Sequence, residues 1–391
     1  MILNILVIGN GFDLAHGLPT KYEHFLKYVE EYKRFINPSR EEFVEENEQL
    51  VRLGQNFTRH FETLYDNHRE IFNEFGKLVS NNVLLNYFCQ IRKNRILAGK
   101  DGWIDFESEI SVIIQTLDSA RVTIIEEIEH GNEHGKMTQQ QWKVLAPIWG
   151  RTDISEKSIK FDETAVGYKK KRLLDNLNEL TRCLEIYLEY YVERLPCTVR
   201  LPDIDKIEIQ RVLSFNYTHT YERLYHTDKS KLIEYDYIHG EVKPDSNVIA
   251  CNMVLGIDEY LDGNARNREN VFVEFKKFYQ RIYKRTGCKY VDWIANAKHF
   301  SKVSKAYSEG WPNNVYIMGH SLDITDKDIL ASLIRMEDTK TTIFYHNQEA
   351  LGNQISNLVK VLGEDELISK VHGKDARIVF QLQQEAVPFK T

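Results

Sequence analysis

The stretch NILVIGNGFDLAHGLP, residues 4–19, decides the fold of this chain. The apolar run over residues 3–8 ends at a glycine, which is typical of a buried parallel strand. Gly9 and Gly11 follow at once, and a Gly-x-Pro at residues 17–19 breaks the backbone again. Glycines at the carboxyl end of a strand let backbone N–H groups approach an anion, usually a pyrophosphate. Tight packing of the strand–helix turn accounts for the same glycines without a ligand, so both interpretations stay open.

The composition is that of an ordinary globular protein and excludes several kinds of partner. The chain has 391 residues, 42% hydrophobic and 28% charged, enough for one large or two ordinary domains. A net charge of −7 and an isoelectric point near 6.0 disfavour general nucleic-acid binding, which needs a basic excess. The five cysteines form no C-x-x-C pair, so they indicate neither a zinc site nor a disulfide scaffold. No apolar run approaches the roughly 20 residues of a membrane span, and we expect a cytoplasmic protein without membrane contacts.

A long helical block separates the first strand from the others. Thr20 and Glu23 have the spacing of a capping box, which predicts a helix start at residue 20. Apolar residues recur at helical spacing through four further stretches, near 40–66, 69–96, 105–130 and 170–195. Residues 131–169 carry the least pattern, and the basic run 169–172 is interpreted as a solvated helix face.

Strand patterns return after residue 202 and alternate with helical ones. The expected strands are residues 211–218, 233–240, 248–256, 314–322, 341–346 and 377–383. Helical patterns lie between them, near 264–306 and from about Thr325, and this alternation favours a parallel α/β sheet. We therefore expect an α/β fold with a Rossmann-like parallel sheet and a large α-helical insertion. Residues 1–19 and 205–391 form the nucleotide-binding core in this interpretation, and residues 20–204 form the insertion.

Several motifs together resemble the AbiH abortive-infection family of bacterial phage-defence proteins. They are GNGFDLAHGLP (9–19), WIDFE (103–107), LSFNYTHTYERLY (213–225), YIHGE (237–241), VLGID (254–258) and GHSLDITDKDIL (319–330). The resemblance spans most of the chain and implies an antiviral, abortive-infection effector. It also implies a partner, either a phage trigger or a companion defence protein.

The α/β core also resembles the sirtuins, whose opening pattern is G-A-G-x-S-x-x-x-G-I-P. Asn216 matches the Asn of their T-Q-N stretch, and His239 with Gly240 matches their catalytic His-Gly. The run from Gly319 to Leu322 resembles their nucleotide loop, and Asn347 matches the Asn that contacts the adenosine ribose. The four-cysteine zinc module is absent, and the Asp that ends the T-Q-N-x-D stretch is Thr218 here, so protein deacylation is in doubt. The resemblance implies a site that binds NAD and breaks its glycosidic bond.

These residue types suit cleavage of nicotinamide from ribose, with NAD as the substrate and no metal ion. Asn216 can orient a water through its carbonyl oxygen, and His239 can take a proton from the water or the ribose. Asp13 can stabilise the cationic ribose or bond a ribose hydroxyl. The expected cofactor-binding residues are Gly9, Asn10, Gly11, Phe12, Pro19, Gly319, His320, Ser321, Leu322 and Asn347. A structural interpretation stays open for His239, as the end of a strand, and for Asn216, as a turn former.

Other interpretations use the same residues. GHSL begins like the nucleophile elbow of a serine hydrolase with Ser321 as nucleophile, but its fifth position is Asp323 instead of glycine. A nucleotide sensor without catalysis is a third class. Asp326 and its acidic neighbours are interpreted as charges at a helix N-terminus and not as metal ligands. Asp105 and Glu107 are either a helix cap with a first-turn charge or carboxylates delivered to the nucleotide. The aromatic-rich helical block predicts a homo-oligomer.

Overall fold

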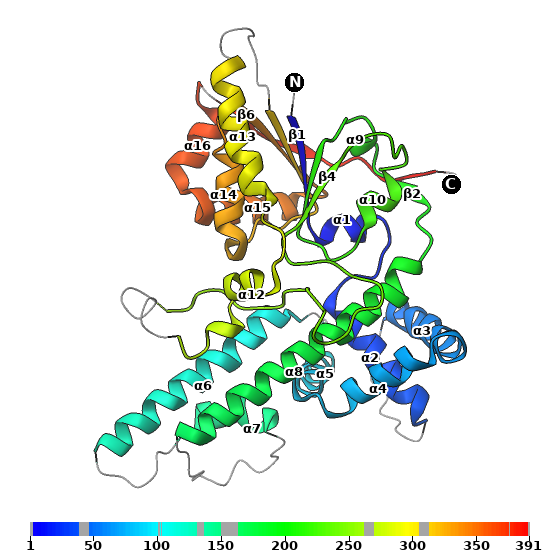
Figure 1. The fold of residues 1–391 in the computed structure, drawn as a ribbon, viewed down its shortest axis with the longest axis vertical. Coiled ribbons are helices and arrows are strands. Elements are labelled where there is room, and N and C mark those ends of the chain that lie inside the picture. The colour runs from blue at the N-terminus through cyan, green and yellow to red at the C-terminus, as the bar shows by residue number, and fades with distance from the viewer. Residues whose placement is uncertain are drawn as a thin grey trace. The chain divides into compact units, whose positions relative to one another are not determined.

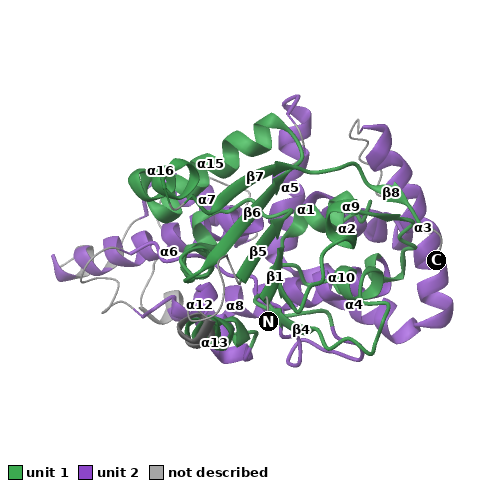
Figure 2. Cartoon of the chain, turned by 90° about the horizontal axis from the view of Figure 1, so that it is seen from above, with its two compact units in different colours: residues 1–20, 192–242, 286–391 green, residues 21–191, 243–285 purple. Residues whose placement is uncertain are grey.

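The fold was analysed in a computed structural model, which divides the chain into two compact units (Figure 2). Unit 1 comprises residues 1–20, 192–242 and 286–391, and unit 2 comprises residues 21–191 and 243–285. The structure describes residues 3–38, 47–100, 102, 104–130, 137–149, 163–261, 270–304, 313–374 and 376–389. Trp103, part of the WIDFE motif, lies outside the described residues.

Unit 1 is built on a six-stranded, entirely parallel sheet with the order β4-β3-β1-β5-β6-β7 (Figure 1). Its strands are β1 (Leu3–Ile8), β3 (Arg211–Ser214), β4 (Glu234–Tyr237), β5 (Asn313–Met318), β6 (Thr339–Tyr345) and β7 (Ile378–Leu382). Counted along the chain within this sheet, the order is 3-2-1-4-5-6, that of doubly wound dinucleotide-binding folds. The predicted parallel α/β fold is therefore confirmed, and β1 has the predicted bounds. A separate antiparallel pair joins β2 (Val199–Arg200) to β8 (Val387–Pro388).

Both faces of the sheet are covered because successive side chains of each strand point to opposite sides. Ile5 and Val7 pack in one apolar cluster, whereas Leu6 and Ile8 pack in the other. The helices of unit 1 are α1 (Asn10–Ala15), η1 (Val192–Arg194), α9 (Pro202–Asp205), α10 (Thr220–Leu224), α13 (Lys289–Ser304), η3 (Ile324–Asp326), α14 (Lys327–Ile334), α15 (Gln348–Leu362) and α16 (Glu364–His372). Residues of α13 to α16 contribute to the first cluster, and residues of α1, α9 and α10 to the second. The change of face occurs between β1 and β5, which is the topological switch point.

Unit 2 consists of helices with their own aromatic core. They are α2 (Tyr22–Ile36), α3 (Glu48–Asn67), α4 (Arg69–Asn81), α5 (Val83–Leu97), α6 (Phe106–Glu129), α7 (Gln139–Ile148), α8 (Glu163–Tyr190), η2 (Val273–Phe275) and α12 (Lys277–Lys284). The ring of Tyr28 on α2 contacts those of Phe57, Phe61, Phe75 and Tyr187, which come from α3, α4 and α8. Buried rings of this size supply much of the apolar area that holds helices together.

The predicted strand over residues 248–256 is wrong. Within the described ranges this apolar segment pairs with no strand, and the backbone of Leu255 is bonded by a side chain instead. The amide of Gln280 donates to the Leu255 carbonyl at 3.2 Å and accepts from its N–H at 3.1 Å. Because one amide side chain satisfies both polar groups, the segment is buried without joining a sheet.

Three helix predictions also need correction. The first helix begins at Tyr22, and the Thr20 hydroxyl donates to Asn10 Oδ1 at 2.6 Å instead of capping it. The stretch 69–96 is two helices, because Asn82 ends α4 and its side chain accepts the Leu85 N–H to start α5. Residues 131–169 contain α7, whose N-cap Thr138 accepts the Gln141 N–H at 3.2 Å.

Gly319→Ala is expected to destabilise the protein by about 2–4 kcal/mol. Gly319 has a φ of +68°, and a Cβ there would overlap the backbone of Phe12, which cannot move without opening the β1 turn. The midpoint of urea unfolding measures the effect. Gly352→Ala on α15 is the control, since a Cβ there meets nothing within 4 Å and alanine favours a helix by about 1 kcal/mol. Equal midpoints for the two variants would contradict the packing role.

Candidate functional site

The loops after β1 and β5 are bonded to each other at the carboxyl edge of the sheet. The N–H of Gly9 donates to Met318 O at 3.2 Å, and the N–H of Gly11 donates to Gly319 O at 2.8 Å. A Cβ on Gly11 would lie 2.8 Å from the Cα of Gly319, so no larger residue fits without a shift. The N–H groups that the anion interpretation required are therefore used between the loops. The packing interpretation of the glycines has direct structural support.

A pocket of about 610 Å³ opens beside these loops, a volume typical of small-molecule sites. It is lined by Gly11, Leu14, Ala15, Gly319, His320, Ser321, Phe344, His346, Ala350, Asn353, Gln354, Asn357, Gln383, Gln384, Glu385 and Ala386. Four of the predicted cofactor-binding residues are in this lining: Gly11, Gly319, His320 and Ser321. Gln354 on α15 ties the wall together, because its Nε2 donates to the carbonyls of His320 and Phe344, each at 3.2 Å.

The other predicted cofactor-binding residues lie outside the lining. Phe12 is fully buried, and its ring packs against His16 and Tyr225. Asn347 is the N-cap of α15, where its Oδ1 accepts the Ala350 N–H at 2.8 Å. The remaining four are Gly9, Pro19 and Leu322, which are buried, and Asn10, which is exposed and bonded to Thr20.

Two histidines meet one carboxylate at the switch point. His239 Nε2 lies 3.4 Å from Asp326 Oδ1, and His320 Nε2 lies 3.5 Å from Asp326 Oδ2. The ring of Phe215 packs edge-on against both histidines. His320 Nδ1 accepts the N–H of Leu322 at 2.9 Å, so the proton of the neutral ring belongs on Nε2, facing the carboxylate. The segments that follow β3, β4 and β5 therefore bring Phe215, His239 and His320 together in one cluster.

Asp326 was interpreted from the sequence as a helix N-terminal charge, and the structure adds a second role, contact with two histidines. It stands at the N-cap position of α14, but its side chain makes no capping bond there. Its carboxylate is about nine-tenths buried and lies within ion-pair distance of both imidazoles. The sequence gives no signal for the contact between Asp326 and His239, because His239 follows β4 whereas Asp326 lies in η3, much later in the chain.

Asp13 and Asn216 lie together under the same edge. Thr218 Oγ1 donates to Asp13 Oδ2 at 2.5 Å, and Asn216 Nδ2 donates to Gly9 O at 2.9 Å. Asp13 is 1% exposed, and burial raises its pKa to about 6 in spite of the bonds from Thr218, Thr220 and Asn216. Among the described residues no donor is bonded to Asn216 Oδ1, which leaves that oxygen able to accept from a water.

A charged cluster beside Asp13 was missed by sequence reasoning. His219 lies between Glu193 and Glu241, with Nδ1 3.4 Å from Glu193 Oε1 and Nε2 3.4 Å from Glu241 Oε2. Burial alone would lower the pKa of His219, but the two carboxylates raise it to about 9. Burial would likewise raise the pKa of Glu193, but the bonds from His219 and Arg223 lower it to about 2. The sequence signal was partial: His219 and Glu241 belong to the motifs 213–225 and 237–241, whereas Glu193 belongs to neither.

The carboxylates of the WIDFE motif have structural roles in unit 2. Asp105 Oδ1 accepts the Glu107 N–H at 3.2 Å and its Oδ2 accepts the Ser108 hydroxyl at 2.6 Å, so Asp105 caps α6. Glu107 pairs with Lys277 at 2.7 Å. The capping interpretation, left open by the sequence, is the one that the structure supports.

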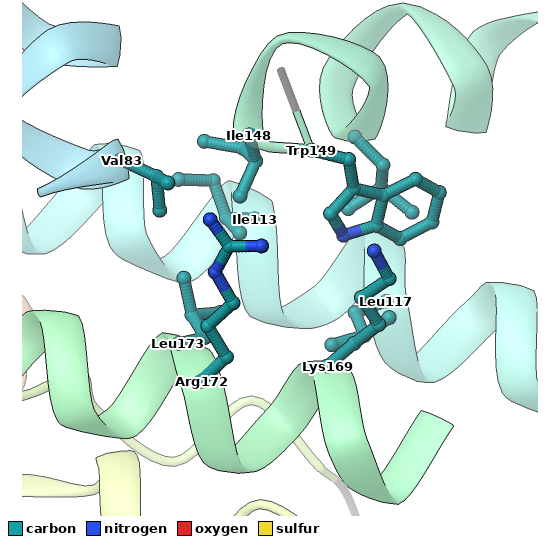
Figure 3. Close-up of a pocket in the computed structure, with 9 residues that line it drawn as sticks. Val83, Ile113, Leu117, Ile148, Trp149, Lys169, Arg172 and Leu173 are labelled. Carbon is teal, nitrogen blue, oxygen red and sulfur yellow. The ribbon is translucent and has the colours of Figure 1, made fainter. Parts of the chain in front are cut away.

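The basic run at the start of α8 lines a narrow apolar slot in unit 2 (Figure 3). Lys169 Nζ lies 5.0 Å from the centre of the Trp149 ring, a cation–π contact, and Arg172 reaches in beside Ile148. The slot has a volume of about 10 Å³, which holds one water at most. We therefore treat it as a packing feature.

The described residues contain no group of three or more histidines, cysteines or acids arranged to hold a metal ion. None of the described helices has the length and apolarity needed to cross a membrane.

The fold and this edge define a doubly wound α/β protein with a pocket and a histidine cluster at its switch point. Comparison then places the chain in a family. The model of the family Bacteriophage abortive infection AbiH matches residues 5–346, so the chain belongs to the AbiH family of abortive-infection proteins. No curated protein matches the chain, and no solved structure does. The likeness to sirtuins therefore stays an interpretation of the motifs.

Asp13→Asn is expected to stabilise the folded protein at pH 8. A carboxyl with a pKa near 6 when folded and 3.8 when unfolded binds its proton more tightly in the folded state. It therefore costs stability as pH rises from 3.8 through 6, by up to about 3 kcal/mol. The melting temperatures of the variant and the wild type, compared at pH 8 and pH 4, measure this. A gain that is equally large at pH 4 would contradict it.

His219→Gln is expected to destabilise the protein by about 1–3 kcal/mol at pH 6. A histidine whose folded pKa is raised to about 9 contributes stability that is complete below 6.5 and lost as pH rises through 9. The difference between wild type and variant should therefore shrink from pH 6.5 to pH 9.5 in urea unfolding. His372→Gln, an exposed change on α16, is the control for the loss of an imidazole. A constant difference across this range would show that the charge is not responsible.

Proposed function

We propose that this AbiH protein hydrolyses NAD to ADP-ribose and nicotinamide as its abortive-infection activity. The observation that carries the proposal is the convergence at one switch point. A pocket of ligand size, lined by His320, opens beside the loops after β1 and β5. The buried imidazole of His239 and the amide of Asn216 follow β4 and β3 on the same edge of the sheet. Ligands of open α/β sheets bind in the crevice at this position.

The pocket supports binding of the nucleotide part of NAD. Its lining joins apolar surface from Leu14 and Phe344 to amide side chains from α15 and from the segment after β7. Such a lining suits a flat base with several polar edges. Ser321 is exposed at the pocket, and its hydroxyl can donate to a phosphate oxygen. The Gly9 and Gly11 N–H groups do not serve as these donors, because they are bonded between the two loops.

His239 is the proposed general base. The bond from ribose C1′ to nicotinamide breaks, its electron pair leaves with the nicotinamide, and a water adds to C1′ and gives up a proton. His239 can take that proton because its ring stands after β4, held by Phe215 and by the carboxylate of Asp326. Hydrogen-bonded orientation of this kind fixes the imidazole for proton transfer.

Asn216 and Asp13 have different parts in the proposal. Asn216 Oδ1 orients the water, because Nδ2 is fixed on Gly9 O and the amide cannot rotate freely. Asp13 acts on the position of the amide and of Thr218, since a carboxylate that is 1% exposed does not reach substrate.

The serine-hydrolase alternative has less support. Among the described residues no hydrogen bond joins Ser321 Oγ to a histidine, and the neighbouring His320 faces Leu322 and Asp326 instead. A nucleophilic serine needs such a base. The sensor alternative keeps the pocket but not the histidine chemistry, and release of nicotinamide from NAD by purified protein distinguishes it. Self-association, a phage trigger and a companion protein remain proposals drawn from the helical block and the family.

His239→Ala and Asn216→Ala are each expected to slow nicotinamide release by about 10²–10⁴-fold without loss of folding. The measurement is nicotinamide formed from NAD, by purified protein and by extracts of phage-infected cells. His372→Ala, a change of the same kind on exposed α16, is the control and should keep the wild-type rate. A folded His239→Ala variant with wild-type turnover would refute the assignment.

A further inference from the structure

One carboxylate of the charged cluster has no part yet in the chemistry proposed for the site. Glu241 follows His239 after a single residue, Gly240, which has a φ of +79° and turns the chain. The side chain of Glu241 is 30% exposed, and the imidazole of His219 lies 3.4 Å from its Oε2. It is the most exposed member of the Glu193–His219–Glu241 group.

Two backbone bonds hold this segment against the one that carries Asn216. Ile238 N–H donates to Ser214 O and Val242 N–H donates to Tyr217 O, each at 2.9 Å. These bonds bracket residues 239–241 on one side and residues 215–216 on the other. Glu241 is therefore fixed on the same edge as the proposed base and the proposed water-binding amide.

We propose that Glu241 is a further catalytic residue, whose carboxylate stabilises the cationic ribose as nicotinamide leaves. The inference rests on the proposed NAD hydrolysis and deepens it. Breaking the glycosidic bond builds positive charge on the ribose, and a fixed carboxylate beside the developing charge lowers the barrier. His219 positions that carboxylate, with its Nε2 3.4 Å from Oε2.

The other carboxylates of this edge fit the task less well. Asp13 is buried, and its raised pKa favours the neutral acid near pH 6. Both oxygens of Glu193 are engaged, Oε1 by the backbone N–H of His219 at 2.6 Å and Oε2 by Arg223 at 2.8 Å. Asp326 lies between two imidazoles and is nearly buried. Of these four carboxylates in the described part of the chain, Glu241 alone combines exposure with a cationic partner.

The neighbouring charges fix the direction of the pH effect. Glu193 and Arg223 face His219 from η1 and α10, and Asp13 lies near Glu193. The Tyr237 ring packs against His219 and lies near Glu241, whereas Glu222 pairs with Lys229. Removing the imidazolium leaves Glu241 among carboxylates. The carboxyl group of Glu241 in that variant binds its proton more tightly. As the pH is lowered, activity that needs the ionised carboxylate is therefore lost at a higher pH than in the wild type.

The test compares nicotinamide release from NAD by wild type, Glu241→Gln, Glu241→Asp and Glu222→Gln, each checked for an unchanged melting curve. We expect a loss in kcat of about 10²–10³-fold for Glu241→Gln with little change in KM, and a smaller loss for Glu241→Asp. Glu222→Gln, the same change on α10, should keep the wild-type rate. In His219→Gln the acid limb of the kcat–pH profile should move to higher pH by one unit or more.

The outcomes separate the two proposals. Active wild type with Glu241→Gln within threefold of its kcat overturns the role of Glu241 and leaves NAD hydrolysis standing. An unmoved acid limb in folded His219→Gln overturns the positioning by His219. Wild type that releases no nicotinamide, either purified or in extracts of phage-infected cells, overturns NAD hydrolysis and the inference with it.

Discussion

The backbone contact between the loop after β1 and the loop after β5 is the constraint on which the rest of unit 1 depends. Gly11 bonds to Gly319 with no room for a side chain on either, and a positive φ at Gly319 turns the second loop toward the first. A contact this close brings the strand ends together at the switch point. His320, which follows β5, and His239, which follows β4, then converge on the carboxylate of Asp326. Glycine is needed here because the two backbones lie too close for a side chain. It affects the chemistry of the site only by bringing the strand ends together.

The same contact explains how the chain tolerates a large helical block after its first strand. β1 lies in the middle of the sheet, although its partners come much later in the sequence, and the side chains of Asn4 and Asn314 are bonded across 310 positions. Closing a long loop costs only slightly more than closing a short one, because the entropy grows with the logarithm of its length. The block also has its own buried aromatic core, so it does not draw on the apolar surface of the sheet.

Local patterns predicted the parallel sheet, because buried parallel strands are continuous apolar runs ended by glycine or a polar residue. They failed at residues 248–256, where an equally apolar run is satisfied by the amide of Gln280, a partner that no local pattern can announce. Part of the candidate site was likewise predictable from local motifs. His239 and Asn216 were found from motifs, whereas the roles of Asp326 and His219 arise from pairs that join separate elements. Charge at a helix N-terminus was a sound local interpretation of Asp326, and only the fold shows what faces it.

The charges at this edge are a poor arrangement for stability and a coherent one for chemistry. A buried carboxyl such as Asp13, with its pKa raised by burial, makes the folded state less stable at neutral pH than an uncharged residue would. Ionisable groups whose burial lowers stability are concentrated at functional sites. Glu193, whose pKa is lowered by His219 and Arg223, adds to this cost, because its charge raises the pKa of Asp13 further. The edge therefore carries fixed negative charge next to a buried acid and a neutral amide, an arrangement that suits a reaction passing through a sugar cation.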